Sequence, residues 1–197
     1  MHPDRNREMA AQDRIVRQHV RQQILRMAAA GAAELVARHV GRLSIPSRLH
    51  GSEGAPQERG AGDARALFDP QCLDMLDALS LAAYATDAAG WITFYNEAAA
   101  ALWGRRPILG RERWCGSWRI YRTDGTLLPH DHCPMAIALL ENRAIRDMDA
   151  VVERPDGSRI RFMPYPTPLR DASDALMGAV NILVDLGPLR GRNIPDS

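Results

Sequence analysis

The first 43 residues place apolar side chains at the spacing of an α-helix. Between Gln12 and Leu43 an apolar residue recurs every three or four positions, with arginines between them. This period predicts an amphipathic helix. Its main apolar positions are Val16, Val20, Ile24, Met27, Leu35, Val36, Val40 and Leu43. Gly31 lies in a run of alanines and indicates either a break in the helix or a close contact with another helix.

A polar, glycine-rich stretch follows Pro46, which ends the helical pattern. Such a composition cannot offset its ordering entropy by burial, so it predicts a flexible linker. We therefore divide the chain into an Arg-rich amphipathic helical segment (1–50), a flexible linker (51–66), a folded domain (67–187) and a disordered tail (188–197).

The apolar period changes to that of β-strands near residue 82. Residues 91–96 alternate between the two faces, and residues 82–87 and 176–186 are further strands. Two more strands flank the turn Pro155-Asp156-Gly157, and Gly187-Pro188 stops the last strand. Helices are expected over 70–79, 97–104 and 133–143. Strands, then helices, then strands again predict an α+β domain with helices on one face of an antiparallel sheet.

Two segments of this domain resemble the PAS family. YATDAAGWITFYNEAAAALWG resembles the opening of a PAS domain, where a strand ends at Asp87, Gly90 forms a turn, and Asn96 precedes a helix. ERPDGSRIRFMPYPTPLRDASDALMGAVNILVDL resembles its close, with Gly157 in the Pro-Asp-Gly turn. The middle, WCGSWRIYRTDGTLLPHDHCPMAIAL, resembles a subgroup found in bacterial sensor histidine kinases and related signalling proteins. The resemblance covers about 73–186, and we assign structural turn and cap roles to Asp87, Gly90, Asn96 and Gly157.

The resemblance implies a PAS fold with a five-stranded sheet whose helical face can enclose a small ligand. It also implies a sensory or signalling protein that binds a small molecule or a partner protein and signals by dimer or helix rearrangement. Expected partners are a second copy of the chain and a signalling protein such as a kinase or regulator. Two alternatives stay open: a ligand-free dimerisation module, and a transcription regulator that uses the basic N-terminal helix.

If the domain holds a ligand, its walls would come from the helices and the sheet. The candidate ligand-binding residues are Trp103, Trp114, Trp118, Tyr121, Ile137, Tyr165 and Asn181. The four tryptophans of the chain could as easily be core residues, because aromatic side chains bury a large area wherever they lie.

The candidates for metal or haem chemistry are His130, His132 and Cys133. They lie between a predicted strand and a predicted helix, so we prefer a loop in which Asp131 or His132 caps the helix. The residues that flank Cys115 differ from those that flank the reactive cysteine of light-sensing flavin PAS domains. We expect Cys115 to pack beside two buried tryptophans. We therefore expect no metal, no haem and no flavin.

Composition and charge narrow the function further. The net charge is +1, but residues 1–50 hold nine Arg against four acids. No helix-turn-helix pattern accompanies this charge, so we do not expect nucleic-acid binding. No apolar run is long enough to span a membrane and no secretory signal appears, which favours a cytoplasmic protein. No catalytic or nucleotide-binding motif is present, so we expect no catalytic residues and no enzyme activity.

Overall fold

The computed structural model describes residues 12, 22–23, 25–38, 74, 76–78 and 80–188. Its centre is an antiparallel sheet in the order β2-β1-β6-β5-β4-β3. The strands are β1 (Ala82–Asp87), β2 (Ile92–Tyr95), β3 (Arg119–Tyr121), β4 (Ala150–Glu153), β5 (Arg159–Arg170) and β6 (Leu176–Pro188). Between them lie α3 (Glu97–Trp103), the 3₁₀ turn η2 (His130–His132) and α4 (Pro134–Leu140). The predicted α+β class is confirmed.

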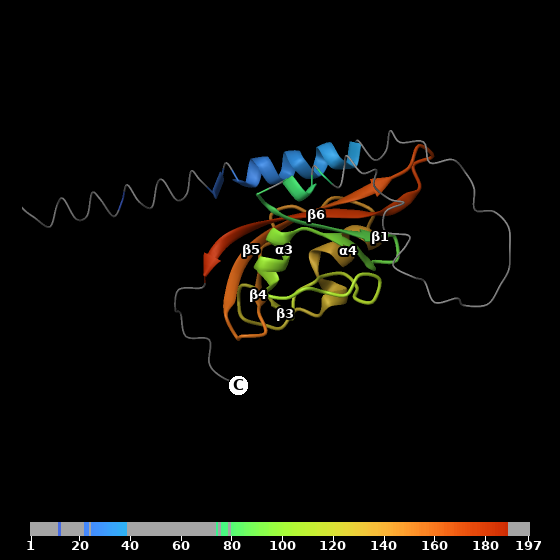
Figure 1. Cartoon of the computed structure of the whole chain (residues 1–197). Helices are drawn as coiled ribbons and strands as arrows, with labels where there is room; N and C mark the ends of the chain where they lie inside the picture. Colours follow the sequence, from blue (N-terminus) through green and yellow to red (C-terminus); the bar gives the residue numbers. More distant parts are fainter. Residues whose placement is uncertain are drawn as a thin grey trace, which may run out of the picture.

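Both faces of this sheet are covered. The inner face carries α3, α4 and the loops around them, while the helix 25–38 lies across the outer face (Figure 1). Alternate strand residues divide between two cores, as the period of two requires. Inner-face strand residues include Ala82, Tyr84, Ile120, Val152, Phe162, Ala179 and Leu183. Outer-face strand residues include Ala83, Ala85, Met163, Tyr165, Leu169, Val180, Ile182 and Val184.

Asn96 fixes the start of α3 and ties it to the sheet. Its side-chain oxygen accepts hydrogen bonds from Ala99 N at 2.9 Å and from Ala83 N at 3.0 Å. Its amide nitrogen donates to Leu76 O at 3.0 Å and to Leu81 O at 2.9 Å. The side chain is buried and uses its full hydrogen-bonding capacity, which is why this position holds an amide. The predicted cap is confirmed.

The prolines of β5 protect one edge of the strand. Pro164, Pro166 and Pro168 alternate along β5, and Pro166 O accepts from Ile145 N on the side away from β6. Residues two apart share that side, so all three prolines remove donors from this edge. Pairing with β4 ends at Phe162, so the prolines lie where the edge would otherwise be open to another strand.

Two details of the predicted sheet are wrong. The sheet has six strands rather than five, because Arg119–Tyr121 pairs with β4. Three residues are too few to show a strand period in the sequence. β6 also continues through Gly187 to Pro188, which pair with Arg161 and Ile160, so Gly187-Pro188 does not stop the sheet.

The N-terminal helix meets the sheet through only part of its predicted apolar stripe: Val36 is in the contact, but Met27 and Leu35 are not. Ala29, Ala33 and Val36 are fully buried, whereas Met27 and Leu35 are 74% and 57% exposed. Small side chains let the helix lie close to the sheet, so the alanines become the contact. Residues 25–38 are continuously helical, which excludes a break at Gly31. The predicted linker 51–66 and the tail beyond Pro188 lie outside the described residues.

Within the described ranges, no helix is both long and apolar enough to cross a membrane.

Candidate functional site

Aromatic side chains fill the space between α3 and the sheet. Trp103 is 1% exposed, and its ring meets those of Tyr84 and Tyr95 edge-on at centroid distances of 5.2 and 5.8 Å. A Cβ on Gly116 would lie 2.5 Å from the Trp103 ring, so the loop backbone touches the indole directly. Trp103 is therefore a core residue, and the loop between α3 and β3 packs directly against its ring.

A polar network lies beside this aromatic cluster. Asn181 Nδ2 donates to Tyr84 Oη at 3.1 Å, and Tyr84 Oη donates to Trp114 O at 2.9 Å. Asn181 Oδ1 accepts from Tyr165 N at 2.8 Å. Burial raises the pKa of Tyr84 well above its ordinary value. The phenol stays neutral and fixes the loop around Trp114 to the sheet.

The seven candidate ligand residues do not meet in one site. Trp103 and Asn181 face the inner core, but Tyr165 lies in the outer core, because neighbouring strand positions point to opposite faces. Trp118 is 52% exposed. Tyr121 lies on edge strand β3, where Arg159 stacks over its ring at 4.4 Å. Trp114 and Ile137 are half-buried.

The predicted turn residues have the expected backbone roles. Asp87 Oδ1 accepts from Trp91 N at 2.9 Å across the β1–β2 turn. Gly90 and Gly157 have φ values of 86° and 80°, the left-handed region that favours glycine. A Cβ on Gly90 would also lie 2.1 Å from the Trp114 ring.

The His-Asp-His-Cys run forms η2 and the entry to α4. Neither Asp131 nor His132 caps α4: its N-cap is Cys133, which makes no side-chain cap bond, so that prediction is wrong. Pro134 at the first position of α4 removes one N–H that a cap would satisfy.

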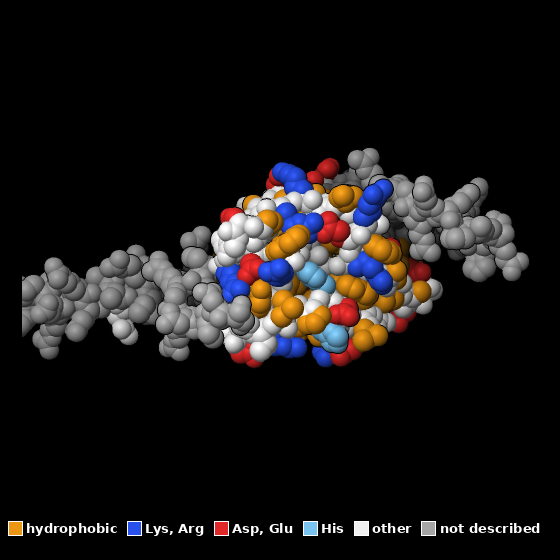
Figure 2. Space-filling model, turned by 90° about the horizontal axis from the view of Figure 1, so that it is seen from below, with side chains coloured by type: hydrophobic (Ala, Val, Ile, Leu, Met, Phe, Trp, Pro, Cys, Tyr) orange, Lys and Arg blue, Asp and Glu red, His pale blue; other side chains and the backbone are white. Residues whose placement is uncertain are grey.

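The three candidate metal ligands of this run have different surroundings. His130 Nε2 lies 3.2 Å from Ser117 O, His132 is exposed, and Cys133 is buried with its pKa raised to about 12 by burial. No group of three or more potential ligands forms in the described part of the chain. In Figure 2 the histidines lie among hydrophobic side chains and charges of both signs.

Cys115 is buried in the segment between α3 and β3. Its sulfur lies 2.9 Å from Ser117 Oγ, and burial raises the pKa of the thiol. The prediction that it packs beside two buried tryptophans is half right: Trp114 packs against the inner core, but Trp118 faces outward.

A small surface pocket of about 310 Å³ lies above Cys115. Its cations already have partners. Arg105 makes two hydrogen bonds to Glu112, at 2.7 and 2.8 Å, and Arg113 lies over Trp91 and Trp114. Burial lowers the pKa of His130, which therefore adds little positive charge at neutral pH. The cations of this pocket are therefore engaged in contacts within the protein.

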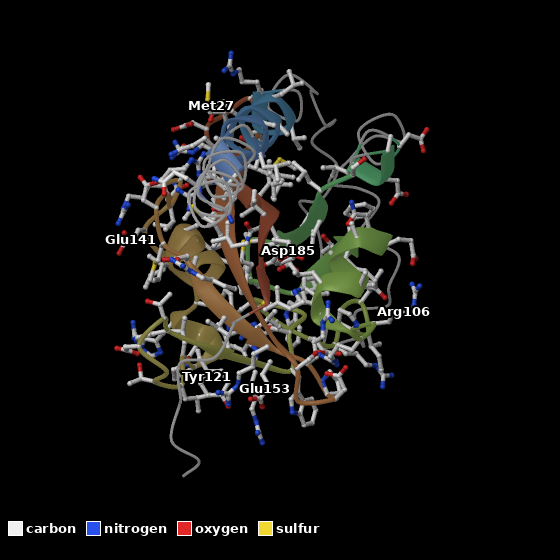
Figure 3. All side chains as sticks on the ribbon, turned by 90° about the vertical axis from the view of Figure 1, so that its left-hand side faces the viewer. Met27, Arg106, Tyr121, Glu141, Glu153 and Asp185 are labelled. Carbon is white, nitrogen blue, oxygen red and sulfur yellow. The ribbon has the colours of Figure 1, made fainter. Side chains whose placement is uncertain are left out.

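The larger groove, of about 760 Å³, opens between the N-terminal helix and the domain. Its walls are Gln22, Leu25 and Ala28 from the helix, Ala98, Ala101 and Leu102 from α3, and the ends of β1 and β6. Asp185 lies at this end of the sheet, between the helix and α3 (Figure 3). Arg154 also lines the groove, and its guanidinium donates to Ala101 O and Leu102 O at 2.8 and 3.0 Å. Anything bound here would touch the helix and the domain at once.

Sequence reasoning missed this groove because it depends on how the helix docks. The signal that could have located the docking face is the spacing of Ala29, Ala33 and Val36, which share one helix face. Alanine by itself does not indicate which helix face is buried, because it is common on both buried and exposed faces of helices.

No protein-family model matches the chain, and neither does any curated protein sequence. Solved structures do match. The PAS domain of an HTR-like protein from Haloarcula marismortui is 16% identical, with a TM-score of 0.43, over 58% of this chain and 88% of that one. The LOV domain of a blue-light activated histidine kinase from Erythrobacter litoralis is 19% identical, with a TM-score of 0.42, over 55% of this chain and 98% of that one.

These likenesses transfer no ligand and no activity to this chain. The strand order and pairing show directly that residues 80–188 form an antiparallel sheet with α3 and α4 on one face. This is the α+β arrangement that the resemblance in the sequence predicts.

Proposed function

We propose that this protein is a bacterial sensory module in which a small molecule or a partner protein changes the docking of the helix 25–38 on the outer face of the sheet. The observation that carries the proposal is the nature of this docking. The helix touches the sheet through two alanines, one valine and partly buried neighbours. Burial of these side chains is worth about 4 kcal/mol before the cost of ordering the helix.

The hydrogen bond between the helix and the end of β6 is long: Gln22 Nε2 reaches Leu186 O at 3.5 Å. The carboxylate of Glu34 interacts electrostatically with Arg146, which lies over the Tyr165 ring on the outer face. An element held by a few kcal/mol can be shifted by a ligand that prefers one of its two positions.

The groove of about 760 Å³ supports a small molecule as the input, because its walls include both helix and domain. The filled space around Trp103 supports an input at this groove or at a protein surface rather than inside the inner core. The output would pass through the helix to a second copy or to a kinase or regulator. This role needs no catalytic residue.

Hydrogen exchange on the full-length protein tests the proposal. We expect the amides of 25–38 to exchange through a local opening, much faster than those of β6, which open only with the whole domain. If both segments exchange at the same rate under all denaturant concentrations, the helix is not an independent element and the proposal is wrong.

Native mass spectrometry after gentle purification identifies the input. A co-purifying small mass supports a bound ligand. An empty dimer supports the alternative of a ligand-free dimerisation module, and the same spectra report the oligomeric state.

A further inference from the structure

Arg26 lies on the side of the helix 25–38 that faces the sheet. It precedes Ala29 by three positions and Ala33 by seven, the spacing of one helix face, and both alanines are fully buried. The Arg26 side chain is partly buried, and its Nε–H group is buried without a hydrogen-bond partner. It also makes no ion pair with any residue of the described ranges. A buried donor on a cation is costly to leave unpaired, so Arg26 lacks an acceptor.

Arg146 lies on the domain side of the same interface. Its guanidinium donates to Ile145 O at 2.9 Å, Pro166 O at 3.1 Å and Thr167 Oγ1 at 3.0 Å. These bonds use three of its five N–H groups and fix the guanidinium in place. The Nε–H group and one hydrogen of Nη2 are left without an acceptor among the described residues.

The charge of Arg146 is not neutralised by a close carboxylate. Burial lowers its pKa, and the carboxylates of Glu34 and Asp147 oppose this shift without reversing it. Neither of the two forms an ion pair with Arg146. By contrast, the pKa of Arg159 is raised by its hydrogen bond to Glu153 at 2.7 Å. Arg146 is therefore a half-buried cation whose counter-charges stay at a distance.

The two arginines act on the same side chain, Tyr165 in the outer core. Arg146 Cζ lies 5.8 Å from the centre of the Tyr165 ring. Burial raises the pKa of Tyr165, and the charge of Arg26 opposes this shift most strongly. The Tyr165 side chain is 4% exposed, and its hydroxyl donates to Met163 Sδ at 3.4 Å, a weak acceptor. One phenol and two cations therefore gather at the interface between helix and sheet without a strong acceptor among the described residues.

We propose that a tetrahedral oxyanion, either inorganic phosphate or the phosphate group of a small molecule, binds between Arg26 and Arg146 beside the Tyr165 hydroxyl. Arginine N–H groups match phosphate oxygens in a fork, and a tetrahedral anion has enough oxygens to accept from both arginines and the phenol. The inference rests on the proposed change in helix docking and gives its input a chemical class. Because Arg26 comes from the helix and Arg146 from the domain, the site is complete only when the helix is docked. Binding therefore stabilises the docked helix.

Hydrogen exchange of the full-length protein in inorganic phosphate tests the site, with chloride at the same ionic strength as the reference. Calorimetric titration of phosphate into the same protein gives the Kd. Exchange of 25–38 should slow by about tenfold at roughly ten times the Kd, because the open helix does not bind the anion. The effect should saturate, whereas a general effect of phosphate on burial grows with concentration.

Two variants with the same change of charge separate this site from general electrostatics. Arg26→Gln keeps a good helix former and should abolish both the calorimetric binding and the phosphate effect on exchange. Arg143→Gln removes an exposed arginine that pairs with Glu141 close to Arg146 in the chain, and it should keep both. Arg146→Gln is the second test of the site and should behave as Arg26→Gln does.

No saturable effect in the wild type, or equal effects in Arg26→Gln and Arg143→Gln, would overturn the inference. Slower exchange with vesicles that contain phosphatidic acid, but not with free phosphate, would also overturn it, because the arginines would then bind a lipid surface. If phosphate does nothing while 25–38 still exchanges through a local opening, the proposed function stands without this input. If Arg26→Gln abolishes binding but 25–38 and β6 exchange at the same rate, the site stands and the proposed function fails.

Discussion

The two layers that cover the sheet are built in opposite ways. The inner layer uses large side chains around Trp103, and hydrogen bonds from Asn96 and Arg154 tie both ends of α3 into the domain. The outer layer uses alanines, and the hydrogen bond from Gln22 Nε2 to Leu186 O at the end of β6 is 3.5 Å long. The first arrangement makes a folding core. The second is the arrangement expected of a layer that can leave without unfolding the rest, as we propose for the helix 25–38.

The largest effect should follow from removing the hydrogen-bond hub of the inner layer. Asn96→Ala leaves two buried N–H groups and two carbonyls without their partner, and we expect a loss of about 3–4 kcal/mol in the free energy of unfolding. Urea unfolding measures it. Asp171→Ala, which removes turn hydrogen bonds in an exposed loop, is the control and should cost about 1 kcal/mol or less. Equal losses in the two variants would contradict the role of Asn96.

Overpacking the inner layer should come next. Gly116→Ala puts a methyl group 2.5 Å from the Trp103 ring, in a core with little room to adjust. We expect a loss of about 1–3 kcal/mol. Gly31→Ala is the same change in the outer layer, where nothing is touched, and should stabilise the helix by about 0.5–1 kcal/mol. Thermal unfolding of both variants compares the layers, and a loss at both glycines would show that they do not differ in this way.

A buried charge should release the outer layer alone. Ala33 is fully buried against the sheet, whereas Leu35 on the same helix is 57% exposed. Ala33→Asp should abolish the exchange protection of 25–38 and leave that of β6 close to wild type. Leu35→Asp should change neither. If Ala33→Asp also removes the protection of β6, the outer layer is part of the folding core.

The smallest effect concerns acid stability at the β3–β4 edge. Burial alone would raise the pKa of Glu153, but hydrogen bonds from Arg159 at 2.7 Å and Arg119 at 3.2 Å outweigh it and lower the pKa. A carboxyl whose folded pKa lies below its unfolded value stabilises the protein above the unfolded pKa. That stability is lost as the pH falls through the folded pKa.

Glu153→Gln should therefore flatten the decline in unfolding free energy below about pH 4.5. Glu97→Gln removes an exposed pair with Arg106 and should have much less effect, because solvent screens it. If the free energies of unfolding of the wild type and of Glu153→Gln fall in the same way as the pH is lowered, this ion pair contributes nothing to stability.

Local signals gave the cap of α3 and the turns at Gly90 and Gly157 correctly, but they did not give the N-cap of α4. Asn96 before a short alanine-rich helix, and Gly90 and Gly157 in their turns, depend on neighbours within a few residues. The candidate ligand residues were harder, because Tyr165 and Asn181 face opposite sides of the sheet. Which face is inner depends on strand pairing across the whole domain. The three-residue β3 was missed because its partner strand, rather than its own sequence, makes it a strand.

The sequence by itself determined that an α+β domain follows an N-terminal helix, because periodicity, caps and turn residues act locally. Only the tertiary structure decided which stripe of that helix is buried. The larger residues Met27 and Leu35 face away from the domain, and Ala29, Ala33 and Val36 face the sheet, because the small alanine side chains let the helix backbone come close to the sheet. That choice created the groove beside Asp185 and left an apolar ridge centred on Gly31 facing away from the domain.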